Sequence, residues 1–218
     1  MRQDDTQAAV SDYWSRRAPA FDGVASHVAQ AGLWRQVLEA AFEADGPKDV
    51  VDLGTGTGAC ALVAAGLGHR VRACDGAAGM LAVARQAAET SGLSIAFEPA
   101  LIADCTFADA SADIVTLRNV LWTLPDPAAA LRKAHKLLRP GGLILVSDGL
   151  WSVAPQYRST YAEELAAALP RHDGLSEDDA RAMLAEAGFG PARGWQHLFA
   201  GSPYPGDVPM FVLTARKP

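Results

Sequence analysis

The sequence has few cysteines and no cluster of basic residues. Its three cysteines, Cys60, Cys74 and Cys105, are widely spaced, so neither a disulfide framework nor a C-x-x-C metal site is expected, and no metal is predicted. Lysine and arginine total 19 against 25 acidic residues, which gives a net charge of −6. Without a basic block, the chain lacks the electrostatic footprint of a protein that binds nucleic acid or an anionic membrane. A small-molecule substrate is expected instead, handled by a monomer or homodimer.

Long hydrophobic runs and a targeting signal are also absent. The first nine residues are polar and acidic, and no apolar run is long enough to span a bilayer, so a cytoplasmic protein is predicted. Half of the 218 residues are apolar. That composition and length are enough for one substantial core but short for two independent domains.

From Lys48 onward, apolar runs alternate with helical patterns, which is typical of β-α-β units and of a parallel sheet with helices on both faces. Strands are predicted over 49–53, 70–74, 94–98, 113–117 and 143–147, and helices over 59–67, 79–90, 127–138 and 176–187. Asp126 and Pro127 are suited to cap and begin the third of these helices. The last apolar stretches, 194–199 and 209–215, are predicted to pair as an antiparallel hairpin.

A glycine-rich turn, Asp52-Leu53-Gly54-Thr55-Gly56-Thr57-Gly58, follows the first predicted strand. Its glycines let the backbone approach a ligand closely and place a helix N-terminus beside it, which suits a carboxylate or a phosphate equally. Residues 54–59 also fit the dinucleotide fingerprint G-x-G-x-x-G/A, with Asp75 at the distance expected of a ribose-binding acid. The turn alone therefore leaves an NAD(P)-dependent oxidoreductase open.

Residues 51–58, Asp75, Asp104 and 119–142 resemble the class I S-adenosylmethionine-dependent methyltransferases. The resemblance is to their small-molecule, ubiquinone-biosynthesis-like branch, methyltransferase types 11 and 25. The segment 13–22 is similar to one that these proteins carry ahead of the domain. The resemblance implies an α/β fold with a Rossmann-like, doubly wound sheet of seven strands, mostly parallel with an antiparallel C-terminal hairpin. A Tyr-x-x-x-Lys pair, expected of many dehydrogenases, is absent.

The resemblance also implies a domain division and a cofactor. Residues 1–47 are expected to form an N-terminal helical lid segment, and 48–218 the methyltransferase domain, with a substrate-lid insert at about 150–175. The cofactor is S-adenosyl-L-methionine, with its methionine part at the glycine-rich turn and its ribose on Asp75. The predicted cofactor-binding residues are Tyr13, Asp52, Gly54, Thr55, Gly56, Asp75, Gly76, Met80, Asp104, Cys105, Arg118 and Asn119.

Each side chain in this set has a structural alternative. Asp75 also suits a helix cap, and Asp104 suits a solvated loop. Arg118 also suits an ordinary ion pair, Met80 a core position, and Tyr13 a packed ring with any hydroxyl partner. Cys105 is expected to offer a backbone N–H near the adenine.

Methyl transfer from a sulfonium is an in-line displacement, which needs the nucleophile about 3 Å from the methyl carbon and water excluded. A hydroxyl nucleophile also needs its proton removed, whereas a neutral amine, a thiolate or an enolate can react without a protein base. His27, His172 and Tyr157 are the catalytic candidates, each with a surface or core position as its alternative. The predicted function is methyl transfer to an oxygen, nitrogen or carbon of a small molecule. Other displacement chemistry on the same cofactor, such as cyclisation, and a non-catalytic cofactor-binding role stay open.

Overall fold

A seven-stranded sheet, in the order β3-β2-β1-β4-β5-β7-β6, runs through the part of the chain that the structure describes. The structure is a computed structural model, and it describes residues 3–24, 31–153, 163–201, 203–204 and 208–218. The strands from β1 to β5 run parallel, whereas β7 is antiparallel to both β5 and β6. The strands are β1 Asp49–Leu53, β2 Arg70–Asp75, β3 Ile95–Pro99, β4 Ala112–Arg118, β5 Leu138–Gly149, β6 Arg193–Gly194 and β7 Met210–Arg216.

The strands β1, β4, β5 and β7 are largely buried, and their side chains alternate between two hydrophobic clusters, one on each face of the sheet. Val50 and Ile114 point to the cluster formed with the helices before and after β1. Val51 and Val115, one residue further along each strand, point to the opposite cluster. This arrangement confirms the doubly wound α/β fold that the sequence predicted.

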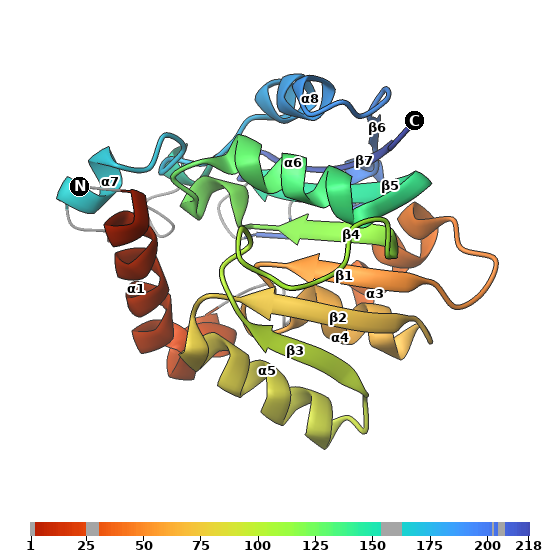
Figure 1. The fold of residues 1–218 in the computed structure, drawn as a ribbon, viewed down its shortest axis with the longest axis horizontal. Helices are drawn as coiled ribbons and strands as arrows, with labels where there is room; N and C mark the ends of the chain where they lie inside the picture. The colour runs from red at the N-terminus through yellow and green to blue at the C-terminus, as the bar shows by residue number, and fades with distance from the viewer. Residues whose placement is uncertain (1–2, 25–30, 154–162, 202, 205–207) are drawn as a thin grey trace.

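Helices cover both faces of the sheet (Figure 1). α6 begins as predicted, with the Asp126 carboxylate accepting the Ala129 N–H at 2.8 Å and Pro127 in the first turn. No helix among the described residues is long and apolar enough to cross a membrane. The helices are α1 Gln3–Val24, α3 Ala31–Phe42, α4 Ala59–Gly66, α5 Ala78–Thr90, α6 Pro127–Leu137, α7 Glu163–Ala167 and α8 Glu177–Glu186.

The predicted strand over 194–199 is largely wrong. Only Arg193 and Gly194 pair with β7, and Gln196–Leu198 form a 3-10 turn, η4. Trp195 is buried, with its indole N–H donating to Thr214 Oγ1 at 2.8 Å and its backbone N–H to the Val212 carbonyl. The next backbone N–H groups bond within the turn, from Leu198 to the Trp195 carbonyl and from Phe199 to the Gln196 carbonyl. They are therefore not available to β7, and the strand ends although the sequence stays apolar.

α1 stands across the carboxyl ends of the parallel strands, to which the arrowheads of β1, β2 and β4 point (Figure 1). It packs closely on the turn between β2 and α5. A Cβ at Gly79 would collide with the backbone of Ser15, and one at Gly76 would meet Leu101 and the Ser11 hydroxyl. The glycines of this turn therefore let α1 approach the end of the sheet where open α/β sheets bind ligands.

Candidate functional site

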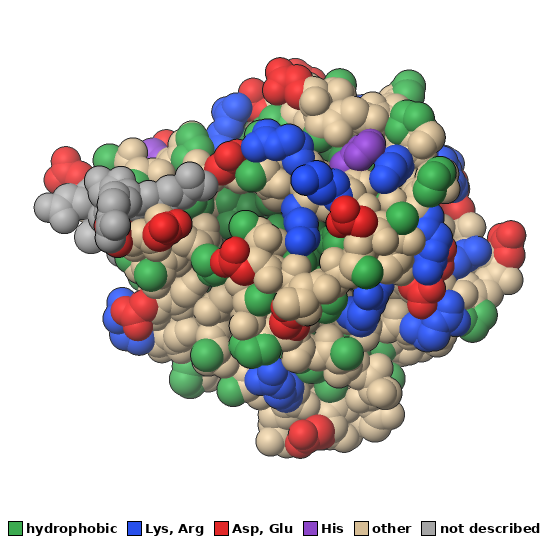
Figure 2. Space-filling model, viewed as in Figure 1, with side chains coloured by type: hydrophobic (Ala, Val, Ile, Leu, Met, Phe, Trp, Pro, Cys, Tyr) green, Lys and Arg blue, Asp and Glu red, His purple; other side chains and the backbone are tan. Residues whose placement is uncertain are grey.

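A cavity of about 120 Å³ lies at the carboxyl ends of β1, β2 and β4, beneath α1. Figure 2 shows a hollow on this face of the molecule, with hydrophobic side chains inside it. Nine of the twelve predicted cofactor-binding residues line the cavity. They are Asp52, Gly54, Thr55, Gly56, Asp75, Gly76, Met80, Arg118 and Asn119.

The glycine-rich turn forms the floor of this cavity. The N–H groups of Gly54 and Thr55 both donate to the Cys74 carbonyl, which ties the turn to the end of β2. Gly54 and Gly56 have φ values of +68° and +58°, in the left-handed region. A Cβ at Gly54 would overlap the Val120 side chain, whereas one at Gly56 would enter open space. The turn is thus a cradle that a β-carbon at position 56 would partly fill.

Asp52, at the end of β1, is almost fully buried next to the cavity. Its two carboxylate oxygens accept hydrogen bonds from the hydroxyls of Thr116 and Thr55, each at 2.6 Å. Burial raises the pKa of Asp52, and the two hydroxyls and the nearby charge of Arg118 oppose that rise. The side chain is therefore held rigidly on the sheet side of the cavity, where a cation would stabilise its ionised form.

Asp75, at the end of β2, accepts backbone N–H groups on both carboxylate oxygens. Oδ2 binds Gly56 N–H at 2.8 Å, and Oδ1 binds Ala77 N–H at 2.7 Å. Burial raises the pKa of Asp75, while these two N–H donors lower it. Each oxygen keeps a further lone pair, so both can still accept hydroxyls from a ligand in the cavity. The carboxylate links the glycine-rich turn to α5 as well as lining the cavity.

Arg118 and Asn119, at the end of β4, shape the wall of the cavity opposite Asp75. The Arg118 guanidinium lies over the Trp34 ring, 3.8 Å from its centroid, and no ion pair to it is found among the described residues. Asn119 has φ +55°, an uncommon conformation for a residue other than glycine. Its Nδ2 donates to the Tyr204 hydroxyl at 2.8 Å, and its backbone carbonyl accepts the Trp122 indole N–H at 3.1 Å. Strain of this kind is typical of ligand sites.

One face of α1 lines the cavity. Tyr13, the cofactor-binding residue predicted on this helix, lies beside that face. Gln7, Ser11 and Trp14 border the cavity at a spacing of three or four residues, which places them on one helical face. Tyr13 does not border it. Its ring packs edge-on against Trp14, and the Arg17 guanidinium lies over it at 5.3 Å. The spacing of Gln7, Ser11 and Trp14 is visible in the sequence, but nothing local shows what the helix covers.

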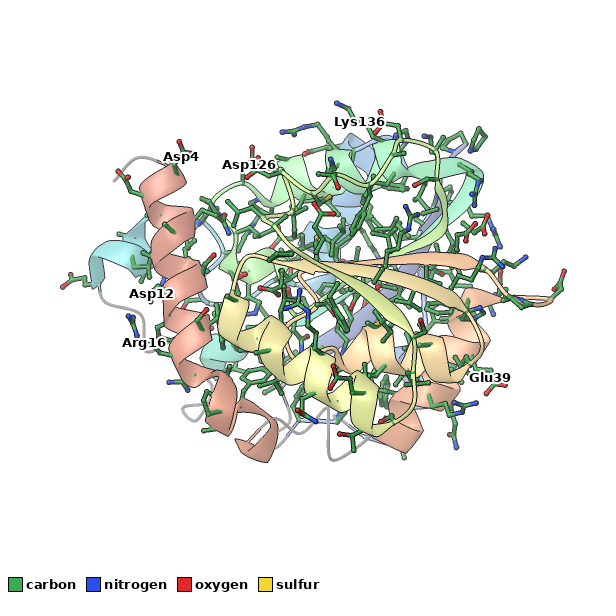
Figure 3. All side chains as sticks on the ribbon, turned by 60° about the horizontal axis from the view of Figure 1, so that its bottom comes forward. Asp4, Asp12, Arg16, Glu39, Asp126 and Lys136 are labelled. Carbon is green, nitrogen blue, oxygen red and sulfur yellow. The ribbon has the colours of Figure 1, made fainter. Side chains whose placement is uncertain are left out.

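Asp104 lines a second cavity of about 140 Å³, which shares Gln7, Leu101, Ile102 and Leu124 with the first. Its side chain is exposed, and Asp4 of α1 and Asp126, both labelled in Figure 3, line the same cavity. The Cys105 backbone N–H already donates to the Leu101 carbonyl at 3.0 Å. The adenine-binding role of Asp104 and Cys105 stays a prediction.

The Cys105 thiol has partners that are distant in sequence. The interaction with the Cys74 thiol and the charge of Lys133 lower the pKa of Cys105, whereas burial raises it. Lys133 also donates to the Cys105 carbonyl at 3.0 Å. Both cysteines are buried.

Of the three catalytic candidates, His172 is the one among the described residues. His27 and Tyr157 lie outside the described residues. His172 lies between α7 and α8, with Nδ1 3.2 Å from the Leu169 carbonyl and Nε2 3.6 Å from the Asp173 carboxylate, and it does not line the cavity. A catalytic role for any of the three stays a prediction.

Asp148, which the sequence did not single out, is a fully buried carboxyl group near the end of β5. Its Oδ1 accepts the Gly149 N–H and the Trp151 indole N–H, each at 2.9 Å. Burial raises the pKa of Asp148 to about 7, although these two donors and the backbone N–H groups of Trp122 and Leu121 lower it. The sequence offers one possible signal for this site, because Asp148 lies at the end of a strand and three residues before Trp151.

This raised pKa predicts that stability falls as the pH rises. Between the ordinary pKa of aspartate, near 4, and about 7, the folded state holds a proton that the unfolded state has lost. The contribution of Asp148 to the free energy of unfolding should fall by up to about 1.4 kcal/mol per pH unit over that window. Thermal melts at pH 5, 6, 7 and 8 should therefore show a shallower decline for Asp148→Asn than for the wild type. Asp52 and Asp75 contribute slopes of the same sign in both proteins, so equal slopes would contradict the prediction.

Known proteins resemble this chain in both sequence and fold. A family described as methyltransferase domain matches residues 51–146. A demethylmenaquinone methyltransferase of Paenarthrobacter aurescens is 31% identical over 174 residues, covering 78% of this chain and 67% of that protein. Another protein of that name, from Mycolicibacterium vanbaalenii, is 31% identical over 186 residues, covering 78% and 77%.

Solved structures share the fold at lower identity. The cyclase SpnF superposes with a TM-score of 0.74 at 19% identity, covering 97% of this chain and 96% of that one. An N-methyltransferase of Haemonchus contortus, solved with S-adenosylhomocysteine, gives a TM-score of 0.68 at 16% identity, covering 95% of this chain and 58% of that one. Their likeness concerns the fold alone, whereas the sequence relatives decide the family. The chain belongs to the class I S-adenosylmethionine-dependent methyltransferases that act on small molecules.

Proposed function

We propose that the cavity at the ends of β1, β2 and β4 binds S-adenosylmethionine and that the chain transfers its methyl group to a small-molecule acceptor. The observation that carries the proposal is the open cradle at Gly56, which lines the cavity together with Asp52 and Asp75 and has no protein atom within 4 Å of its Cβ position. A cradle of backbone with a carboxylate on each side suits a ligand that carries an ammonium group and a pair of hydroxyls.

Different residues of the chain would bind different parts of the cofactor. The turn at Gly54 and Gly56 would hold the methionine part, and Asp75 would accept the ribose hydroxyls while keeping its bonds to Gly56 and Ala77. Met80, buried at the start of α5, would pack on the adenine. Bound S-adenosylmethionine supplies a methyl carbon activated by the sulfonium.

The chain's own contribution to the reaction is orientation and the exclusion of water. α1 lies over the cavity and lines it with Gln7, Ser11 and Trp14, which supports a lid role for the segment 1–47. The equivalent role of the insert at about 150–175 stays a prediction, as do the cytoplasmic location and the oligomeric state. Holding an acceptor in line with the methyl group turns an encounter into a positioned displacement, which can supply several kcal/mol of the barrier reduction.

The names of the relatives suggest the class of acceptor. Two proteins that are 31% identical to this chain are named demethylmenaquinone methyltransferases. We extend the proposal to an acceptor with a quinone-type ring.

The proposal is tested by transfer of a labelled methyl group. Purified protein with methyl-labelled S-adenosylmethionine should label a reduced quinone or another ring acceptor from a panel of small molecules, and Gly56→Ala should abolish the labelling. A chain that binds S-adenosylhomocysteine yet labels no member of the panel or of a metabolite extract would overturn methyl transfer. That result would favour cyclisation or a non-catalytic role.

A further inference from the structure

Arg118, the last residue of β4, is a buried cation whose donors are not used by the protein. It lines the cavity and is only 9% exposed. Its Nε and Nη2 are enclosed, and neither has a hydrogen-bond acceptor within the part of the chain that the structure describes. A guanidinium cannot lose its charge in a protein, and a buried charge without partners is costly. Buried polar groups are almost always hydrogen-bonded, so these donors indicate a missing partner.

The neighbours of Arg118 hold the guanidinium in place without using its donors. Trp34 lies against its face, with the ring centroid 3.8 Å away, and such stacking leaves the N–H groups in the guanidinium plane free. The Asp52 carboxylate is near enough for the charge of Arg118 to act on its pKa. Its oxygens, however, accept the hydroxyls of Thr55 and Thr116, and no ion pair between Asp52 and Arg118 is found among the described residues.

The neighbouring strand does not supply the acceptor either. The register of β4 and β5 pairs Arg118 with Ser147, so both side chains project from the same face of the sheet. The Ser147 hydroxyl is buried and has no hydrogen-bond partner itself. Among the described residues that line the cavity, the charged ones are Asp52, Asp75 and Arg118. An anionic group that enters the cavity therefore has one cation to meet.

We infer that Arg118 binds a carboxylate group of a ligand in the cavity. A carboxylate matches the planar guanidinium because it can accept two parallel N–H bonds from it. The inference rests on the proposed function, since the cavity is the proposed site of methyl transfer. Two ligands of that reaction can supply a carboxylate: the amino-acid end of S-adenosylmethionine, and an acceptor that is itself an acid. The test has one arm for each source.

The first arm removes the carboxylate of the cofactor alone. Calorimetry compares S-adenosylmethionine with its decarboxylated form, which keeps the sulfonium and the ammonium. If Arg118 binds the cofactor, the wild type should prefer the complete cofactor by about ten- to a hundredfold, the range expected for a hydrogen bond between charged groups. Arg118→Met should reduce that preference to within about threefold, because methionine offers neither charge nor donors.

The second arm removes the charge of the acceptor. With S-adenosylhomocysteine saturating, calorimetry compares phenylacetate and 1-naphthylacetate with their amides, which have nearly the same shape but no charge. If Arg118 binds the acceptor, the wild type should bind at least one of these acids about ten- to a hundredfold more tightly than its amide. Arg118→Met should bind the acid and the amide about equally. The arm whose preference depends on Arg118 identifies the source of the carboxylate.

Arg72→Met is the matched control for Arg118→Met. The Arg72 guanidinium also lies over an aromatic ring, 5.3 Å from the centroid of Phe107, but it donates to Ser111 and does not line the cavity. Its loss should leave both preferences unchanged. Arg118→Lys keeps the charge but not the planar pair of donors, so it should retain only part of the preference. Thermal melts show which variants are folded, and Arg118→Lys decides if Arg118→Met is not.

The outcomes distinguish this inference from the proposed function. If the wild type binds S-adenosylmethionine but neither preference depends on Arg118, the guanidinium is a structural cation and the inference is wrong. An equal loss of preference in Arg72→Met would also overturn it. Failure of both S-adenosylmethionine and S-adenosylhomocysteine to bind the wild type would instead overturn the proposed function.

Discussion

Replacing Asp75 with alanine is expected to weaken the binding of S-adenosylhomocysteine about ten- to a hundredfold. A hydrogen bond to a charged group contributes about 1.5–3 kcal/mol, and each 1.4 kcal/mol is about a factor of ten in affinity. The substitution also removes the acceptor of the Gly56 and Ala77 N–H groups, so the melting temperature should fall. Calorimetric titration well below the melting temperatures of both proteins measures the affinity.

Asp49→Ala is the matched control for this substitution. Asp49 begins β1, at the opposite end of the sheet, and its carboxylate binds Arg70 and Arg139. Its loss should lower stability but leave the affinity for S-adenosylhomocysteine within about twofold of the wild type. Unchanged affinity in Asp75→Ala, or an equal loss in Asp49→Ala, would contradict the assignment of Asp75 to the ribose.

Replacing Gly56 with alanine is expected to reduce the affinity for S-adenosylhomocysteine at least about a hundredfold. The new methyl group would enter the open space of the cradle, where the proposed cofactor approaches the backbone. Alanine at φ +58° also destabilises the fold by about 1–2 kcal/mol. Calorimetry gives the affinity, and a thermal melt gives the loss of stability.

Gly92→Ala separates these two effects. Gly92 follows α5 with φ +65°, and a Cβ there would also meet nothing within 4 Å, but it does not line the cavity. The two alanine variants should therefore lose similar stability, and only Gly56→Ala should lose binding. Retained binding in Gly56→Ala would show that the cofactor does not approach the turn at this residue.

The sequence predicted those parts of the fold that local patterns determine. The buried strand Asp49–Leu53 and the cap at Asp126 are visible as an apolar run and as an Asp-Pro pair, and the structure has both. The sheet order depends on contacts between distant segments, which no local pattern contains. It could be predicted only from the resemblance to a family. The short β6 shows the limit, because the hydrogen bonds of Trp195 with β7 decided where pairing stops.

The candidate site was predictable where its residues end strands. Asp52, Asp75 and Arg118 all lie at the carboxyl ends of parallel strands, which meet at one edge of the sheet. The α1 side of the cavity was not predictable in the same way. A helical spacing shows that Gln7 and Trp14 share a face, but their packing partner is the turn at Gly76 and Gly79, distant in sequence.

Charge and burial at the site depend on tertiary contacts. Asp148 has a raised pKa because β5 is central in the sheet and its end is covered by the turns that carry Trp122 and Trp151. The lowered pKa of Cys105 comes from Cys74 and Lys133, which lie far from it along the chain. A local pattern can point to Asp148 and its partner Trp151, but neither pKa shift can be predicted from a short stretch of sequence, because each depends on burial or on distant partners.

The central claim, that the cavity beneath α1 holds S-adenosylmethionine, is tested most directly by titrating the purified protein with S-adenosylhomocysteine and, separately, with NAD. The dinucleotide is the informative competitor because the turn from Gly54 to Ala59 also fits its fingerprint. We predict one S-adenosylhomocysteine bound per chain, with binding lost in Gly56→Ala, and no binding of NAD. Binding of NAD with none of S-adenosylhomocysteine would contradict the account.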